Sequence, residues 1–224
     1  MKVWDIYTRL WHWLLAGGIF FQWLSGEVLD DQMQNHALMG YSLLGMMIFR
    51  LCWGFIGPES IRFSRFVPSW SSLTGYLSKT DNAIYVSHNP LGALAVIAFI
   101  GLITLQALSG FFMEDEIFFT GPFYNWLSEN TKAAIADIHE LAFTGILLLI
   151  AIHIIAVLYH RFKQEPFIVK AMVTGNKPLT NPFQLLSTMQ LHLRAWLCIG
   201  VSIIIIWSMV NYLPGWLGIE ADYY

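Results

Sequence analysis

The sequence has little charge. Only 12% of its 224 residues are charged, whereas 56% are hydrophobic, and its mean hydropathy is +0.55. A soluble domain carries about 25% charged residues, so this charge cannot cover a soluble surface. Intrinsic disorder is excluded on the same grounds, because it requires low hydrophobicity and high charge. The composition therefore predicts an integral membrane protein.

Cysteine is also scarce. Cys52 and Cys198 both lie in apolar runs, and the sequence has no CxxC spacing. A disulfide framework and a thiolate zinc site are therefore not indicated. The absence of a CxxCH motif excludes a covalently attached c-type haem. No basic tract provides a nucleic-acid footprint.

Long apolar runs are what the sequence does have. A helix needs about 20 apolar residues to cross the bilayer core. Five runs meet this requirement: Leu10–Leu29, His36–Ile56, Leu91–Met113, Ala134–Phe162 and Leu193–Leu213. The first is expected to be a retained span, because no A-x-A-like cleavage site follows it. A polar loop separates the second and third runs, and its piece Pro68–Lys79 is expected to form an interfacial helix.

Basic residues predict the orientation of these spans. If the N-terminus is cytoplasmic, all 12 Lys and Arg residues except Lys132 fall inside. The positive-inside rule then predicts a multi-pass protein of the bacterial inner membrane, with a cytoplasmic N-terminus and a periplasmic C-terminus. The outer side is expected to be acidic, and its acids are Glu27, Asp30, Asp31, Glu114, Asp115, Glu116, Glu129, Asp137, Glu140, Glu220 and Asp222.

Four histidines at the spans point to a cofactor. His139 and His153 share one apolar helix. Their spacing leaves both rings within roughly 40° of the same face and separates them by about 21 Å along the axis, so they cannot share one ion. Topology places His12 at the depth of His153 and His36 at the depth of His139.

Each pair consists of neutral imidazoles from facing helices, which is typical of haem b in a helical bundle. Zinc would require four ligands. We therefore expect two bis-histidine haem b groups, one held by His12 with His153 and one by His36 with His139. A lone histidine at a span end more often only forms hydrogen bonds, but four with matching depths are hard to explain in that way.

Other residues are weaker candidates for cofactor binding. Arg9 and Arg50 lie at inner span ends, where haem propionates need cations, although the positive-inside rule also explains them. His88 is expected near a quinone site at the inner end, together with Arg62, Arg65 and Lys170, for which solvated loop charge is the simpler interpretation. His160 and His192 are not expected to be ligands. Five glycines leave room for either a porphyrin or close helix packing: Gly17, Gly18, Gly40, Gly45 and Gly145.

Several motifs resemble a known family. They run in order from the N-terminus to about residue 180: Arg9-Leu10-Trp11-His12-Trp13, His36-xxx-Gly40-Tyr41, Trp53-Gly54-Phe55, Arg62-Phe63-Ser64-Arg65-Phe66, His88-Asn89-Pro90-Leu91-Gly92, the His139 and His153 pair, and Ala171-Met172-Val173-Thr174-Gly175-Asn176-Lys177. Together these residues resemble the bacterial cytochrome b561 and nickel-iron hydrogenase cytochrome b family.

The resemblance implies an all-α membrane protein whose residues 1–180 form a four-helix bundle with two b haems. The family's ligand positions correspond to His12, His36, His139 and His153. The family exchanges electrons between quinone in the membrane and a redox partner, such as a hydrogenase, another dehydrogenase or a c-type cytochrome. Residues 181–224 lie beyond the matched part. They are expected to add a fifth transmembrane helix that docks a partner subunit, followed by a short periplasmic tail.

Three functions remain open at this point. The first is an electron-transfer subunit of a quinone-linked oxidoreductase, with the substrate chemistry on another chain. The second is a stand-alone superoxide:quinone oxidoreductase, as in some family members, although an acidic outer mouth would repel an anion. The third is a haem-free membrane anchor or transporter, which must treat four depth-matched histidines as coincidence.

Overall fold

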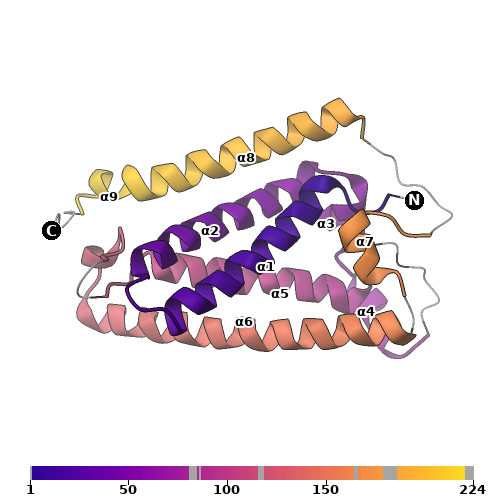
Figure 1. Cartoon of the computed structure of the whole chain (residues 1–224), viewed down its shortest axis with the longest axis horizontal. Helices are drawn as coiled ribbons and strands as arrows, with labels where there is room; N and C mark the ends of the chain where they lie inside the picture. The colour runs from indigo at the N-terminus through magenta and orange to yellow at the C-terminus, as the bar shows by residue number, and fades with distance from the viewer. Residues whose placement is uncertain are drawn as a thin grey trace. The chain divides into compact units, whose positions relative to one another are not determined.

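The described part of the chain is helical. The computed structural model describes residues 2–80, 85, 87–115, 119–163, 166–178 and 186–219. Within these residues the backbone forms α-helices and two short 3-10 helices, with two isolated β-bridges and no strand (Figure 1). The prediction of an all-α fold is therefore confirmed.

Each predicted span corresponds to one long helix. These helices are α1 (Ile6–Glu27), α2 (Met33–Ile56), α5 (Pro90–Gly110), α6 (Glu129–Lys163) and α8 (Thr188–Asn211). Among the described residues, α2, α5, α6 and α8 are long and apolar enough to cross a membrane. Helix α1 is long enough at 22 residues, but Arg9, His12 and Gln22 reduce its hydropathy. Its crossing of the membrane stays a prediction.

Short helices occupy the connections between the long ones. They are η1 (Glu59–Ile61), α3 (Phe63–Phe66), α4 (Trp70–Leu77), η2 (Tyr124–Trp126), α7 (Ile168–Thr174) and α9 (Leu213–Trp216).

The chain groups into two compact units. The first unit comprises Met1–His12, Arg50–Ile100 and Leu148–Cys198, and the second comprises Trp13–Phe49, Gly101–Leu147 and Ile199–Tyr224. The predicted boundary between residues 180 and 181 lies outside the described residues, as do the acids Glu116, Glu220 and Asp222.

In the first unit, capping and a glycine turn organise the N-terminus. The Asp5 carboxylate accepts hydrogen bonds from the N–H groups of Tyr7 (2.9 Å) and Thr8 (3.1 Å), which begins α1 at the next residue. The N–H groups of Val3 and Trp4 donate to the carbonyl of Gly175 and so join this segment to the end of α7 (Figure 1). Gly175 has a φ of +85°, a conformation that glycine adopts without steric cost.

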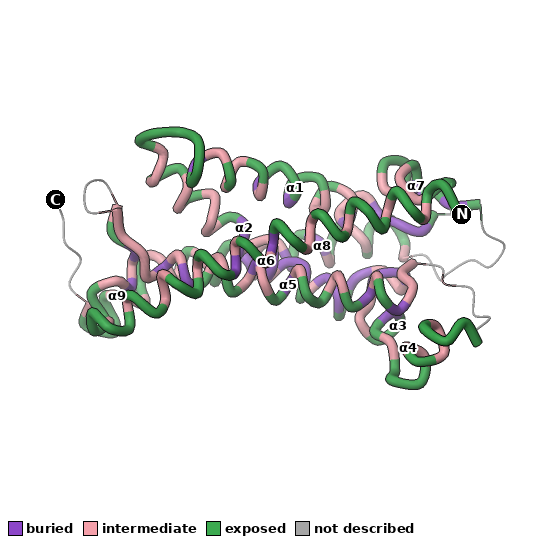
Figure 2. Tube along the Cα trace, turned by 90° about the horizontal axis from the view of Figure 1, so that it is seen from below, coloured by how far each residue is buried: buried purple, intermediate pink, exposed green. Residues whose placement is uncertain are grey.

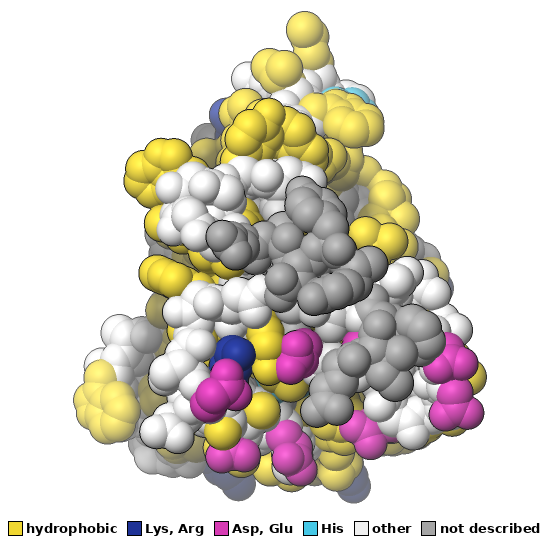
Figure 3. Space-filling view, turned by 90° about the vertical axis from the view of Figure 1, so that its left-hand side faces the viewer, with side chains coloured by type: hydrophobic (Ala, Val, Ile, Leu, Met, Phe, Trp, Pro, Cys, Tyr) yellow, Lys and Arg dark blue, Asp and Glu magenta, His cyan; other side chains and the backbone are white. Residues whose placement is uncertain are grey.

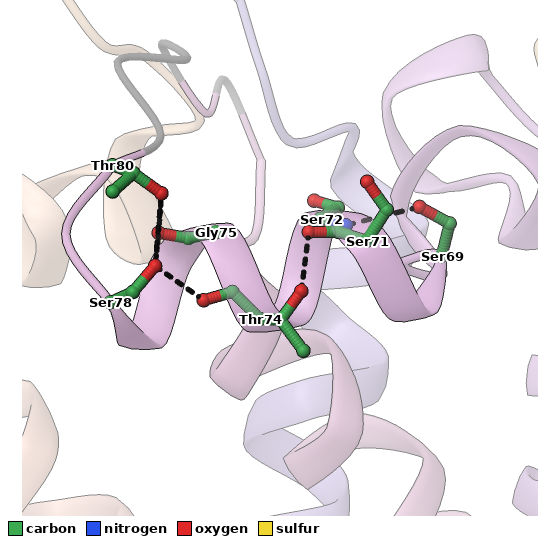
Figure 4. Close-up of a pocket in the computed structure, with 7 residues that line it drawn as sticks. All are labelled: Ser69, Ser71, Ser72, Thr74, Gly75, Ser78 and Thr80. Carbon is green, nitrogen blue, oxygen red and sulfur yellow. Dashed lines mark hydrogen bonds between the residues drawn. The ribbon is translucent and has the colours of Figure 1, made fainter.

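A helix, α4, is present within the segment Pro68–Lys79, and its position at the membrane interface stays a prediction. Ser69 caps it by accepting the N–H of Ser72 at 3.2 Å. Hydroxyl groups line a shallow hollow beside this helix and bond to one another and to nearby carbonyls (Figure 4). Trp70 and Leu77 are exposed, as expected for a helix that lies at a membrane interface.

The second unit has a core to which the fifth long helix contributes. Leu44 of α2, Phe111 and Phe123 are buried together, and Ile206 and Met209 of α8 pack against them. This half of α8 therefore supports α2 and the segment after α5. Four glycines of the second unit lie against neighbouring side chains. A Cβ atom added at any of them would come within 3.5 Å of a side chain: Gly18, Gly40, Gly45 and Gly145.

Large apolar side chains remain exposed along the long helices. Leu141 of α6, Ile155 of α6 and Trp196 of α8 are 73%, 67% and 65% exposed. Exposed residues recur along these helices in Figure 2. Soluble monomers rarely leave apolar surface of this extent in contact with water. The exposure fits helices whose outer faces contact lipid.

Candidate haem-binding site

In the first unit, His12 of α1 faces His153 of α6. Their ring centroids are 6.5 Å apart and their planes are inclined by 52°. Two imidazoles that bind one metal ion from opposite sides, each at about 2.0–2.1 Å, have ring centres roughly 6 Å apart. The pair therefore has the separation that an iron between the two rings requires. Phe99 packs its ring against His153 edge-on, with centroids 5.7 Å apart.

In the second unit, His36 of α2 and His139 of α6 are close enough for their charges to interact. A serine contacts each ring at Nδ1. The Ser25 hydroxyl lies 3.0 Å from Nδ1 of His36, and the Ser109 hydroxyl lies 2.8 Å from Nδ1 of His139. Neither serine stands out in the sequence. The first unit thus brings His12 and His153 together, and the second unit contains both His36 and His139.

The donor set fits haem better than a bare metal ion. No group of three or more His, Cys, Asp or Glu side chains that could hold a metal is found in the part of the chain that the structure describes. Structural zinc needs four protein ligands. A haem iron needs fewer ligands from the protein than structural zinc, and two imidazoles would be enough to hold it.

Arg50 is a buried cation in the first unit. It is 3% exposed, and its guanidinium carbon lies 4.9 Å from the centre of the Phe63 ring and 5.8 Å from that of Phe66. Its Nη2 reaches the Ile61 carbonyl at 3.5 Å, whereas Nη1 is buried without a hydrogen-bond partner. A buried donor without a partner is costly. Arg50 therefore has a donor available for an anion.

Arg9 has a local structural role as well. Its Nη1 donates to the Val173 carbonyl at the end of α7, and its Nε is buried without a hydrogen-bond partner. The Arg9 side chain thus links α1 to α7. The Nε donor of Arg9 therefore remains available to a ligand.

His88 lies just before α5, between two aromatic rings. Its ring centroid is 5.1 Å from that of Trp4 and 4.8 Å from that of Phe66. Burial, followed by the positive charges of Arg50, Lys177 and His153, lowers the pKa of His88 from 6.5 to about 3. His88 is therefore neutral at physiological pH, and its Nδ1 is buried without a hydrogen-bond partner.

The remaining polar candidates of the first unit have local partners. Arg62 donates from Nε to the Gly57 carbonyl at 2.8 Å, and Arg65 forms an ion pair with Glu59. His192 of α8 is hydrogen-bonded to the Tyr7 hydroxyl at 2.6 Å. These contacts explain Arg62, Arg65 and His192 without a cofactor.

Acidic side chains gather at one end of the second unit (Figure 3). Lys132 is held within this end, because its Nζ lies 2.8 Å from Glu129 and 3.8 Å from the centre of the Tyr124 ring. The Tyr124 hydroxyl in turn donates to Glu114. Lys132, the basic residue that the sequence predicts on the outer side, is therefore paired with the carboxylate of Glu129.

Comparison with known proteins identifies the family of this chain. The family model of prokaryotic cytochrome b561 matches residues 3–175. The chain is 28% identical over 144 residues to a probable Ni/Fe-hydrogenase B-type cytochrome subunit of Azotobacter vinelandii, covering 51% of this chain and 59% of that protein. It is 24% identical over 212 residues to a protein of the same description from Rhizobium leguminosarum bv. viciae, covering 78% and 87%.

No solved structure matches this chain. The family match covers most of the sequence and includes all four histidines of the two pairs. A b-type cytochrome carries haem b, and the apolar helices make the chain a multi-pass membrane protein. The chain belongs to the prokaryotic cytochrome b561 family, whose members are electron-transferring membrane cytochromes.

Proposed function

We propose that the protein is a di-haem electron-transfer subunit that links the quinone pool to a periplasmic redox partner. The observation that carries this proposal is the presence of one histidine pair in each unit, with His12 and His153 at a separation suited to bis-imidazole iron. One haem b would be held by this pair and a second by His36 with His139. Haem iron accepts and releases single electrons, and the protein supplies ligation, burial and orientation.

Basic groups of the first unit would bind the propionates of its haem. Arg50 and Arg9 each keep a buried donor without a hydrogen-bond partner. Carboxylates form strong, charge-assisted hydrogen bonds with guanidinium groups. An Arg50–propionate contact would satisfy Nη1, and the surrounding aromatic rings would keep water away from it.

Quinone would bind at the cytoplasmic end, in the first unit. His88 supports this location, because its neutral ring and unpartnered Nδ1 can form a hydrogen bond with a quinone carbonyl. Lys170 and the other basic residues of the loops fit the positive-inside orientation. This orientation places the N-terminus in the cytoplasm and the C-terminus in the periplasm of a bacterial inner membrane.

The partner would dock at the acidic end of the second unit. The relatives from Azotobacter and Rhizobium are described as hydrogenase cytochrome subunits, so a hydrogenase is one candidate, and another dehydrogenase or a c-type cytochrome are others. Charge complementarity favours a partner with a basic face. The same acidic surface disfavours superoxide as the substrate, because it repels anions.

Quinol-driven reduction of the purified cytochrome tests the proposal. A reduced short-chain quinol is added anaerobically, and haem reduction is followed in the visible spectrum. We expect both haems of the wild type to be reduced and then reoxidised by a basic acceptor such as a c-type cytochrome. An H153A variant should keep the second-unit haem but receive electrons from quinol much more slowly. A fully loaded wild type that no quinol reduces would contradict the proposed link to the quinone pool.

A further inference from the structure

A five-residue pattern occurs twice in the second unit. Helix α1 ends with Gln22-Trp23-Leu24-Ser25-Gly26, and α5 ends with Gln106-Ala107-Leu108-Ser109-Gly110. Both segments follow the pattern Gln-x-Leu-Ser-Gly, which we call the twin motif. One copy contacts His36 and the other contacts His139. The two copies of the twin motif thus contact both histidines of one predicted haem.

The serines of the twin motif are oriented as hydrogen-bond acceptors. The Ser25 hydroxyl donates to the Phe21 carbonyl at 2.9 Å, and the Ser109 hydroxyl donates to the Gln106 carbonyl at 2.9 Å. A hydroxyl has a single hydrogen. When that hydrogen is directed to the helix carbonyl, the serine oxygen can accept a hydrogen bond from Nδ1–H of its histidine.

In that arrangement each serine selects the tautomer of its imidazole that carries the proton on Nδ1. A neutral imidazole has one N–H, and a hydrogen bond at one nitrogen determines which nitrogen is free. With the proton on Nδ1, the lone pair of Nε2 is available for iron.

The glycines of the twin motif leave room for the rings. A Cβ atom added at Gly26 would lie 3.1 Å from Cε1 of His36, and one added at Gly110 would lie 3.5 Å from Cε1 of His139. The first distance is tighter than most Cβ contacts, so the His36 ring would have to move by a few tenths of an ångström, and the second is ordinary contact. A larger residue at position 26 would therefore push the His36 ring away from its serine.

We propose that the twin motif, through the hydrogen bonds of its two serines, orients both histidines of the second-unit haem and lowers the reduction potential of that haem. This inference rests on the proposed function. Ser25 and Ser109 are positioning residues, since they act through His36 and His139. A hydrogen-bond acceptor at Nδ1–H makes the imidazole a stronger donor to iron. Stronger donation stabilises the oxidised iron, and outer-shell hydrogen bonds are among the means by which proteins tune haem potentials.

The test compares S25A, S109A and the double variant with the wild type, each purified as the haem-loaded full chain. Haem content is measured first, and midpoint potentials are then obtained by anaerobic redox titration. Electron paramagnetic resonance of the oxidised protein reports the ligand field of each haem. We expect one of the two potentials to rise in each single variant and to rise further in the double variant. The signal of the same haem should shift, and the other haem should keep both values.

A matched control is available in the same unit. Ser42 of α2 also donates its hydroxyl to the carbonyl four residues earlier, Leu38, at 2.9 Å, but it is exposed and has no histidine partner. S42A should therefore leave both potentials unchanged. S25T and S109T restore a hydroxyl and should return the potential toward that of the wild type.

The possible results separate this inference from the proposed function. Unchanged potentials and spectra in the double variant would overturn the role of the twin motif while leaving a di-haem wild type intact. If S25A or S109A loses its haem, recovery of haem in the threonine variant supports the inference, and failure to recover it overturns the inference. A wild type without a second haem would contradict the proposed function itself.

Discussion

Replacement of His88 by glutamine should remove a large part of the protein's acid sensitivity. Burial and nearby positive charges lower the pKa of His88 from 6.5 to about 3. Below pH 6.5 the unfolded chain binds a proton at this ring, whereas the folded chain stays neutral. The contribution of His88 to the unfolding free energy is therefore fully present above pH 6.5 and is lost as the pH falls toward 3.

The size of this effect follows from the interval between the two pKa values. Each pH unit between them costs about 1.4 kcal/mol of unfolding free energy, so the full interval costs about 5 kcal/mol. Between pH 7 and pH 5 the wild type should lose about 2 kcal/mol through His88 alone. The H88Q variant should not show this part of the loss, because glutamine does not titrate.

The assay measures unfolding free energy in detergent at pH 7 and pH 5 for the wild type, H88Q and F66L. Phe66 packs against His88 at 4.8 Å between ring centroids, with the planes inclined by 43°, but carries no titratable group. F66L should therefore lower the stability at both pH values by a similar amount. If H88Q loses as much stability as the wild type on acidification, the reasoning from burial and charge is refuted.

The other predictions concern the ligands and the glycines. H12A and H153A should each lose the same haem, and H36A and H139A should each lose the other, as judged by haem content and redox titration; loss of haem in a crossed pattern would contradict the pairing. G54A should lower the unfolding free energy by about 1–3 kcal/mol through overpacking, because its Cβ would lie 2.1 Å from Cε2 of Phe63. G101A is the control, since its Cβ would meet nothing within 4 Å; equal effects in thermal unfolding would be the contrary result. G26A should alter the spectrum of the second-unit haem more than G110A, because the two added Cβ atoms would lie 3.1 Å and 3.5 Å from the histidine rings; a reversed order in the electron paramagnetic resonance spectra would count against the contact geometry.

Much of the fold could be predicted because a membrane span requires a run of about 20 apolar residues, which can be read directly from the sequence. The five apolar runs coincide with five long helices, and their ends differ by a few residues where caps operate. Helix α1 begins at Ile6 because Asp5 caps it, and α5 begins at Pro90, where Asn89 accepts the N–H of Gly92 at 2.8 Å. Hydropathy does not register such caps, so the runs alone could not locate these ends.

The histidine pairs were predictable for a similar reason. Helical periodicity and depth are one-dimensional quantities, and they sufficed to match His12 with His153. Which residues surround each pair depends on contacts between helices that are distant in sequence, and these contacts are not visible in periodicity or depth. Arg50 lies at a span end, where a propionate-binding role and the positive-inside rule were both open, and the sequence did not indicate that the Phe63 and Phe66 rings of α3 pack against its guanidinium.

The twin motif illustrates a signal that was present in the sequence but difficult to interpret. A Ser-Gly pair at the end of an apolar run is the ordinary composition of a helix terminus, and neither copy contains a metal ligand. Only the contacts of Ser25 with His36 and of Ser109 with His139 distinguish them. Repetition of Gln-x-Leu-Ser-Gly was the available indication. Of the glycines for which a porphyrin or close helix packing was open, Gly18 packs against Leu43, whereas Gly17 has nothing within 4 Å of an added Cβ.

The most direct test of the central claim is the number of haem groups per polypeptide. Purified full-length chain, expressed with ample haem, is assayed by the pyridine haemochrome method together with a quantitative protein determination. The account predicts two b-type haems per chain, one for each histidine pair. A single haem would contradict one of the pairs, and a folded chain without haem would contradict the electron-transfer function.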